Sequence, residues 1–273
     1  MEDNINQIKP KHKKTKITLY VVLRLFVIIA MIAQAIRGNY ANVFSCVLAL
    51  ILFLIPSIID KKLNIELPNV LEGIILLFIF SALVLGEIQN FYGIFKYWDT
   101  ILHTLNGFIM GGVGFALIDI LNKSDKFHIT LAPIFVALVA FCFSMTIGIL
   151  WEFYEYASDT LLRTDMQKDT IITDISSVTL NIEGENVPIK LDNITNVGIY
   201  NDIDGVEEQY VVKGGYLDIG LVDTMEDLIV NCIGAIGFCI IGYEYISTRG
   251  KKNFAQNFIP KLKQTFKNTK KVK

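Results

Sequence analysis

The segment "WDTILHTLNGFIMGGVGFALIDI", residues 98–120, is apolar over most of its length but begins with an aspartate and a histidine four residues apart. A run of about 20 apolar residues can cross the ~30 Å hydrocarbon core of a bilayer as a helix. Ionisable side chains are costly inside such a helix, and they indicate functional sites by default. The segment therefore predicts a membrane helix in which Asp99 and His103 have a specific role.

Five other apolar blocks accompany this one, so the chain is predicted to be an all-α polytopic membrane protein. The composition agrees, because 52% of the residues are hydrophobic and the mean hydropathy is +0.46, both above the values usual for soluble domains. The six predicted spans cover roughly 17–36, 41–59, 69–89, 99–121, 130–156 and 223–246. The first block also resembles a signal peptide, but its length and the second block close behind it favour an uncleaved span.

The distribution of Lys and Arg predicts the orientation in the membrane. With a cytoplasmic N-terminus, the inner segments 1–16, 60–68, 122–129 and 247–273 carry 18 basic residues, and each short outer loop carries one. The positive-inside rule therefore places both termini in the cytoplasm. Arg24 lies within the first span, where we expect it to snorkel or to pair with an acid.

The long segment between the fifth and sixth spans, residues 157–222, differs in kind from the rest. It carries twelve acidic and four basic residues, a net charge of −8. Its β-branched runs "SVTLNI", "VPIKLD", "NVGIY" and "QYVVK" are separated by turn residues and predict short strands. We therefore expect a small, acidic, β-rich insert on the outer side, which is a candidate surface for a partner.

These patterns predict five parts of the chain. They are a basic cytoplasmic head (1–16), the first five membrane helices (17–156), the extracytoplasmic insert (157–222), the sixth membrane helix (223–246) and a basic cytoplasmic tail (247–273).

The predicted topology brings ionisable residues from four spans to the same outer leaflet. Residues three or four positions apart share one face of a helix, so each span has one polar stripe. The stripes are Asp99 with His103, Glu152 with Glu155 and then Asp159, and Asp223 with Asp227 and Asn231, while Glu87 ends the third span. Stripes that avoid lipid must point at each other, which predicts a shared acidic pocket containing one histidine.

Several carboxylates in one pocket repel each other unless protons, a cation or a basic side chain neutralises them. Carboxylates together with an imidazole suit a divalent metal such as zinc, manganese or iron. Candidate metal ligands, or general acid and base, are His103, Asp99, Glu152, Glu155 and Asp227, with Glu87, Asp223 and Asn231 in support.

A simpler interpretation of these residues stays open. Asp99, Asp223 and Asp227 lie near predicted helix N-termini, where acids interact favourably with the helix dipole. Glu152 and Glu155 would then face interfacial water, and Trp98 and Trp151 would belong to an aromatic belt. Gly107 with Gly111, and Gly234 with Gly237, are typical of close helix packing.

The stretches "YWDTILHTLNGFIMGGVGF", "GILWEFYEYASD", "DMQ" and "DTMEDLIVNCIGAIGF" together resemble the YjdF-like family of bacterial inner-membrane proteins, which has no assigned function. A looser resemblance links Asp99, His103, Asp227, Asn231 and Gly234 to VanZ-like membrane proteins. The resemblance implies a bacterial inner-membrane location and no particular reaction. The β-rich insert departs from both families.

Three functions remain open at this point. The first is a membrane protein whose outer-leaflet pocket, with or without a divalent metal, acts on a lipid-linked or cell-envelope substrate. The second is a small ion-coupled transporter, and the third is a scaffold whose insert binds a partner while its acids only stabilise the bundle. The lipid bilayer is the one partner common to all three, and no motif indicates nucleic-acid binding.

Overall fold

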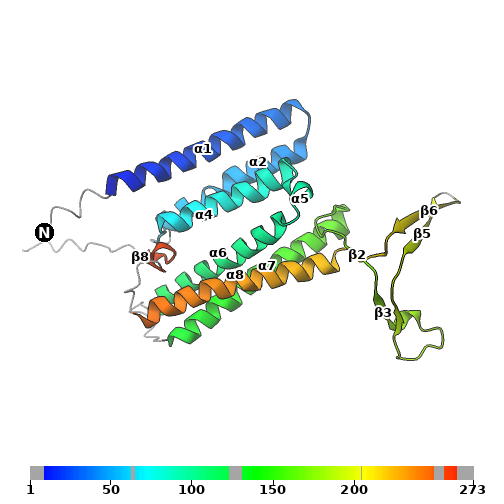
Figure 1. Cartoon of the computed structure of the whole chain (residues 1–273). Coiled ribbons are helices and arrows are strands. Elements are labelled where there is room, and N and C mark those ends of the chain that lie inside the picture. Colours follow the sequence, from blue (N-terminus) through cyan, green and yellow to red (C-terminus); the bar gives the residue numbers. More distant parts are fainter. Residues whose placement is uncertain (1–8, 63–64, 123–130, 204, 249–254, 263–273) are drawn as a thin grey trace, which may run out of the picture. The chain divides into compact units, whose positions relative to one another are not determined.

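The computed structural model describes residues 9–62, 65–122, 131–203, 205–248 and 255–262 (Figure 1). Within these residues, six helical segments are long and apolar enough to cross a membrane, namely Thr18–Ile36, Asn42–Lys62, Asn69–Ile88, Trp98–Ile118, Pro133–Leu161 and Leu221–Ser247. This confirms the prediction of six membrane-spanning helices. Much of the predicted head (1–8), residues 123–130 between the fourth and fifth predicted spans, and most of the predicted tail (249–254 and 263–273) lie outside the described residues.

The helices depart from the apolar blocks in a few places. Their bounds are α1 (Lys9–Ile36), α2 (Tyr40–Leu52), α3 (Ile55–Lys62), α4 (Asn69–Phe80), α5 (Phe91–Ile94), α6 (Trp98–Asn122), α7 (Pro133–Leu162) and α8 (Leu221–Ser247). The second span consists of α2 and α3, because Pro56 has no N–H to donate and so interrupts the helix. The third span continues from α4 into a π-helical segment, η1 (Ser81–Ile88).

The fifth helix extends beyond the predicted end of its block. The apolar block ends near residue 156, whereas α7 continues to Leu162. The residues in between, 157–162, include the polar residues Ser158, Asp159 and Thr160, but none of the six is glycine or proline, the strong helix breakers. The helix ends where Arg163 adopts a positive φ of 54°, a frequent conformation directly after a helix. Glu152 and Glu155 therefore lie inside a rigid helix and not at its frayed end.

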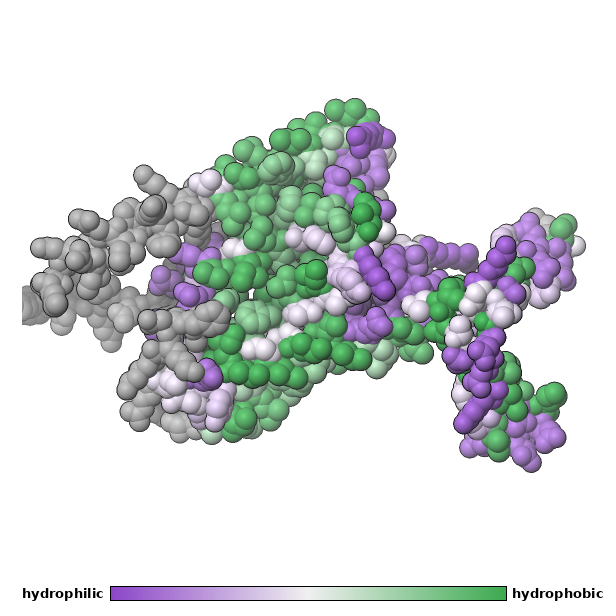
Figure 2. Space-filling model, viewed as in Figure 1, coloured by the Kyte–Doolittle hydropathy of each residue, from purple (hydrophilic) through white to green (hydrophobic). Residues whose placement is uncertain are grey.

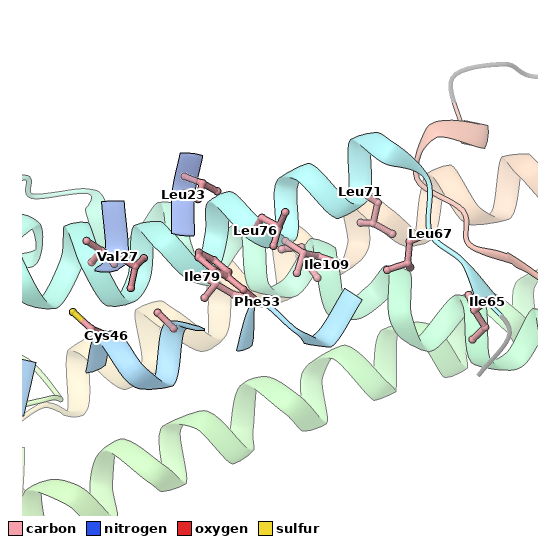
Figure 3. Close-up of a cluster of buried hydrophobic side chains, with 13 residues drawn as sticks. Leu23, Val27, Cys46, Phe53, Ile65, Leu67, Leu71, Leu76, Ile79 and Ile109 are labelled. Atoms are coloured by element: carbon pink, nitrogen blue, oxygen red, sulfur yellow. The ribbon is translucent and has the colours of Figure 1, made fainter. Parts of the chain in front are cut away.

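The chain forms two compact units, and α7 and α8 each run from one unit into the other. Unit 1 comprises residues 1–149 and 228–273, and unit 2 comprises residues 150–227. In unit 1, α1, α2, α4 and η1 pack around a cluster of fully or nearly fully buried side chains (Figure 3). Leu23, Val27, Cys46, Phe53, Leu71 and Leu76 belong to this cluster. On the face seen in Figure 2, the helices of unit 1 are largely covered by hydrophobic residues, as a lipid-facing surface requires.

Helices α6 and α8 approach each other closely through glycines. A Cβ atom built on Gly107 would lie 2.0 Å from the backbone oxygen of Asn231, and one built on Gly234 would lie 2.0 Å from the backbone oxygen of Thr104. Only glycine permits such backbone contact. Small residues at helix interfaces are the usual means of tight packing in membranes, where lipid is as apolar as the side chains.

A short segment near the C-terminus packs back into unit 1. Strand β8 (Lys261–Leu262) pairs with β1 (Ile65–Glu66), next to the short helix η3 (Ala255–Asn257). Ile259 is fully buried in a cluster with Phe115 and Phe238. This segment is therefore part of the fold of unit 1, although the sequence indicated only a basic, partly amphipathic tail.

Unit 2 contains the β-rich insert, which lies between α7 and α8 as predicted. It has three antiparallel pairs of strands, β2 (Ile171–Ile172) with β7 (Tyr216–Leu217), β3 (Ile175–Ser177) with β4 (Ile189–Leu191), and β5 (Asn196–Ile203) with β6 (Val206–Lys213). The runs "NVGIY" and "QYVVK" are strands as expected.

The run "SVTLNI" is mostly not a strand, and this prediction is wrong. Residues Val178–Leu180 form a 3-10 turn, η2. The Ser177 side chain accepts a hydrogen bond from the backbone N–H of Thr179, and the Asn181 side chain accepts one from Glu183. Short polar side chains that bond to the nearby backbone compete with strand pairing in this way, and the β-branched residues between them do not reveal it.

The close contact of α6 with α8 can be tested by comparing the two glycines of the motif "GAIG", Gly234 and Gly237. We expect Gly234→Ala to lower the free energy of unfolding by about 1–3 kcal/mol, because overpacking a tight contact costs this much. Gly237→Ala is the control, since a Cβ there would meet nothing within 4 Å and alanine favours a helix over glycine. Thermal denaturation in detergent measures both variants. Equal effects of the two substitutions would contradict close packing at Gly234.

Candidate acidic site

Three buried acids come together in unit 2. One side-chain oxygen from each of Glu152, Glu155 and Asp227 lies within 4.8 Å of the others. The side chains are only 4%, 7% and 4% exposed. Glu152 and Glu155 come from the end of α7, and Asp227 comes from the second turn of α8, more than 70 positions later in the chain. Acids from two different helices therefore meet away from solvent.

Helix geometry determines which α7 residues take part. Glu152 and Glu155 are three residues apart, so both project from the same face, whereas their neighbours Phe153, Tyr154 and Tyr156 are exposed on the other side. The indole N–H of Trp151 donates a hydrogen bond of 2.9 Å to Oε1 of Glu155. This bond leaves Trp151 directly beside the acidic cluster and orients one of its carboxylates.

The charge of this cluster is its main physical property. Two unit charges 4 Å apart repel by about 4 kcal/mol at an effective dielectric constant of about 20. Three ionised carboxylates within 4.8 Å of one another would therefore be strongly unfavourable without compensation. Protons or a cation can supply that compensation. Three carboxylates on rigid helices are also a suitable ligand set for a divalent cation that prefers oxygen, such as Mg²⁺, Ca²⁺ or Mn²⁺.

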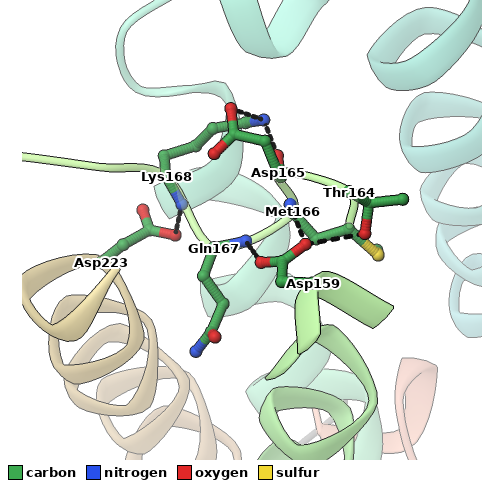
Figure 4. Close-up of polar contacts among 7 residues, drawn as sticks. All are labelled: Asp159, Thr164, Asp165, Met166, Gln167, Lys168 and Asp223. Carbon is green, nitrogen blue, oxygen red and sulfur yellow. Dashed lines mark hydrogen bonds and ion pairs between the residues drawn. The ribbon is translucent and has the colours of Figure 1, made fainter. Parts of the chain in front are cut away.

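The turn after α7 folds back on Asp159, the next acid on the same face. Its carboxylate accepts hydrogen bonds from the backbone N–H groups of Met166 (2.7 Å) and Gln167 (2.8 Å) and from the hydroxyl of Thr164 (2.7 Å). Figure 4 shows these contacts. Asp159 therefore organises the turn that leads away from α7, and its oxygens are engaged there.

Two contacts hold the same turn against the start of α8. The backbone N–H of Lys168 donates a 2.7 Å hydrogen bond to Asp223 (Figure 4), and the side chain of Gln167 donates one to the hydroxyl of Thr224. The motif "DMQ" thus joins the two helices that carry the acids. Asp223, in the first turn of α8, stabilises this junction through its bond to the Lys168 backbone.

Asp218, just before α8, is a structural acid that the sequence analysis did not single out. Burial acts to raise its pKa, but hydrogen bonds from the backbone N–H groups of Thr170, Val222 and Gly220 outweigh burial and lower the pKa. A lowered pKa means that the ionised carboxylate stabilises the fold at neutral pH and that this contribution is lost in acid. The motif "DIGLVD" carries a recognisable signal, because an aspartate just before a helix commonly accepts its first N–H groups.

Asp169 shows the opposite behaviour. Burial, together with the nearby carboxylates of Asp165, Asp218 and Asp159, raises its pKa. Repulsion among these acids therefore weakens as the pH falls. The part of the insert that adjoins α7 and α8 is therefore negatively charged, in agreement with its composition.

The other predicted pair, Asp99 and His103, lies on α6 in unit 1. Nε2 of His103 is 3.5 Å from Oδ1 of Asp99, and the histidine is buried whereas the aspartate is partly exposed. The two side chains are one helical turn apart, as the spacing predicts. Glu87, which was expected in support, is exposed on η1, and it belongs to no metal-capable group among the described residues.

Asn231 has a role in unit 1 that the sequence only partly indicated. It is fully buried, and its Oδ1 accepts a 3.1 Å hydrogen bond from Nδ2 of Asn106 on α6. A Cβ on Gly148 of α7 would lie 2.7 Å from the Asn231 amide nitrogen. The hydroxyl of Ser144 on α7 donates a 2.8 Å bond to the backbone oxygen of Gly107. These polar contacts join α6, α7 and α8.

Asn106 and Ser144 were missed as members of this network. The sequence did show that both are polar residues within apolar helices, which is unusual and could have indicated their role. A serine hydroxyl can also hydrogen-bond to a backbone oxygen of its own helix. The sequence therefore does not show that Ser144 bonds to α6 instead.

A family of proteins and one curated relative match this chain over different lengths. The family described as "Predicted membrane protein (DUF2238)" matches residues 18–248. An "Uncharacterized protein" of Thermotoga maritima is 28% identical over 107 residues, which is 39% of this chain and 53% of that relative. The chain thus spans about half the length of the curated relative that it matches. No solved structure matches the chain.

These matches name no substrate, metal or reaction, and they do not bear on the looser resemblance to VanZ-like proteins. The family match includes all six membrane helices, the acids of α7 and α8, and His103. The chain therefore belongs to the family of predicted membrane proteins described as DUF2238.

Proposed function

We propose that this membrane protein binds a divalent cation through Glu152, Glu155 and Asp227. The observation that carries the proposal is the mutual approach of three buried carboxylate oxygens to within 4.8 Å. Bound Mn²⁺ or a similar ion offsets the repulsion of these charges, and the two helices supply ligands that are already oriented. A metal held by these residues would supply Lewis-acid chemistry, in which it polarises a substrate oxygen or lowers the pKa of a bound water.

We include Asp99 and His103 in the proposed ligand set on the strength of helix periodicity. Gly107 of α6 contacts Asn231 of α8, and both helices are continuous. His103 precedes Gly107 by four residues, and Asp227 precedes Asn231 by four, so each is one turn away on the same face of its helix. An imidazole among carboxylates widens the choice of metal to zinc, iron and manganese.

The proposed substrate class is a lipid-linked or cell-envelope molecule. Support comes from the position of the acids on the parts of α7 and α8 that adjoin the insert, because lipid headgroups lie where membrane helices leave the hydrocarbon core. The resemblance to YjdF-like proteins supports a bacterial inner membrane. The distribution of Lys and Arg supports both termini in the cytoplasm and residues 157–222 outside.

An ion-coupled carrier is the second candidate. The observation in its favour is the polar network of Asn106, Asn231 and Ser144 in the interior of unit 1. Polar side chains inside a bundle are typical of ion and proton pathways. In this case the acids take up protons or a transported cation, and they perform no chemistry.

Cation binding is tested with Trp151, which donates to Glu155 and is one of two tryptophans in the chain. We expect Mn²⁺ to quench its fluorescence in the purified protein. Glu152→Gln or Asp227→Asn should weaken Mn²⁺ binding by at least about tenfold, because mutating even a residue that only supports a metal ligand lowers metal affinity by about 10–100-fold. Glu226→Gln, at the exposed neighbouring position, is the control. Unaltered affinity in both site variants would refute the proposed site.

His103→Ala tests whether the histidine belongs to the ligand set. We expect this substitution to reduce the affinity for Zn²⁺ more than the affinity for Mg²⁺, because imidazole is a good ligand for zinc and a poor one for magnesium. Asp99→Asn should have a smaller effect if Asp99 only orients the ring. Isothermal titration of both metals measures the difference. Equal losses for both metals would instead indicate damage to the bundle.

The orientation is tested by labelling introduced cysteines in intact cells. We expect a membrane-impermeant maleimide to modify a cysteine at position 193, in the insert, and to leave one at position 268, in the basic tail, unmodified. Labelling after cell lysis controls for expression at both positions. The reverse pattern would place the insert in the cytoplasm and overturn the proposed topology.

A further inference from the structure

The β5–β6 ribbon (196–213) has two chemically different faces. Pairing runs from Asn196 opposite Lys213 to Ile203 opposite Val206, and successive side chains in a strand point to opposite faces. One face therefore carries the apolar residues Val197, Ile199, Val206, Tyr210 and Val212, together with the opposed polar pair Asn201 and Glu208, whose carboxylate accepts a hydrogen bond from the Tyr210 hydroxyl. The other face carries the polar residues Asn196, Tyr200, Asp202, Glu207, Gln209 and Lys213, with Gly198 opposite Val211 among them.

The apolar face is open. Ile199, Val206 and Tyr210 are 44%, 63% and 54% exposed, and Figure 2 shows hydrophobic residues on the surface of the ribbons. A two-stranded ribbon is only marginally stable by itself in water, and clustered exposed apolar side chains indicate an interaction surface. Because the ribbon has only two strands, both of its edges also present backbone N–H and C=O groups for pairing.

The polar face contains an unfavourable charge pair. Asp202 lies directly opposite Glu207, and like charges at directly opposed positions destabilise a sheet. Among the described residues of the ribbon, the basic one is Lys213. It lies six residues from Glu207, about 20 Å along the strand, and so is too far away to neutralise the pair. A positive group beside this pair would remove the repulsion.

We propose that the β5–β6 ribbon binds an extended segment of a partner protein in which apolar and basic residues alternate. The segment adds as a further strand at one edge of the ribbon. Its apolar side chains extend the apolar face, and its Lys or Arg side chains lie on the opposite face near Asp202 and Glu207. Strand addition of this kind obtains affinity from backbone hydrogen bonds and specificity from alternate side chains.

The charge of the insert favours a basic peptide strand over a second copy of this chain or an anionic lipid surface. The insert has a net charge of −8 over residues 157–222, so two inserts repel each other and a second copy is a poor partner. Anionic lipid headgroups are repelled for the same reason. A basic strand is attracted, and this attraction weakens with added salt. The inference is independent of the proposed cation site.

The test uses the full-length protein in a zwitterionic detergent and three fluorescent ten-residue peptides. The first alternates Lys with Val, the second alternates Glu with Val, and the third has the composition of the first with its Lys and Val residues in separate blocks. We expect only the first to increase fluorescence anisotropy at micromolar protein. The double variant Asp202→Asn/Glu207→Gln should weaken its binding by about fivefold, and Ile199→Ser should also weaken it.

Three results would overturn the proposal. Equal binding of the block peptide would show simple charge attraction without strand addition. Unchanged binding by the double variant would show that the Asp202–Glu207 pair is not involved. A concentration-dependent dimer that Ile199→Ser abolishes would show that a second copy covers the apolar face. Size-exclusion chromatography of each variant verifies that the bundle is intact.

Discussion

Within a bilayer, every backbone polar group must find its hydrogen-bond partner inside the protein, and this constraint governs the architecture of the chain. It requires helices wherever the chain crosses lipid, and it permits strands only outside, where water satisfies the edges. The six long helices and the small ribbons of unit 2 follow this division. The same constraint explains why the polar side chains of the helices turn toward other parts of the protein.

The close contact of α6 with α8 shows how such a bundle obtains specificity without a hydrophobic driving force. Gly107 and Gly234 let the two backbones touch, and the hydrogen bond from Asn106 to Asn231 selects one rotation of each helix. Shifting either helix by one residue would break the bond and bring a larger side chain into the glycine contact. Van der Waals packing and one buried polar pair therefore determine the register together.

The acids of α7 and α8 repel one another when ionised. Bringing Glu152, Glu155 and Asp227 together is unfavourable by itself, so the surrounding structure must hold them in place. Helix α7 supplies rigidity, Trp151 orients Glu155, and the turn organised by Asp159 and Asp223 joins the two helices. Backbone N–H groups of Met166, Gln167 and Lys168 donate three of the hydrogen bonds in this turn, so the turn depends on backbone conformation as well as on side-chain chemistry. The proposed cation site rests on this approach of three carboxylates.

The sequence by itself determined the six spans, the position of the β-rich insert and the three polar stripes, because apolar length and helical spacing are local properties of the chain. It also indicated that Glu152, Glu155 and Asp227 belong on inward faces. It failed for "SVTLNI", where side-chain bonds to the backbone replaced a strand, and for Arg163, where a positive φ determined the end of α7. Only the tertiary structure decided that Asp159 and Asp223 organise a turn, that Asn231 pairs with Asn106, and that Glu87 is exposed. These outcomes depend on which residues far apart in the chain come within hydrogen-bond distance, and no spacing along a single helix contains that information.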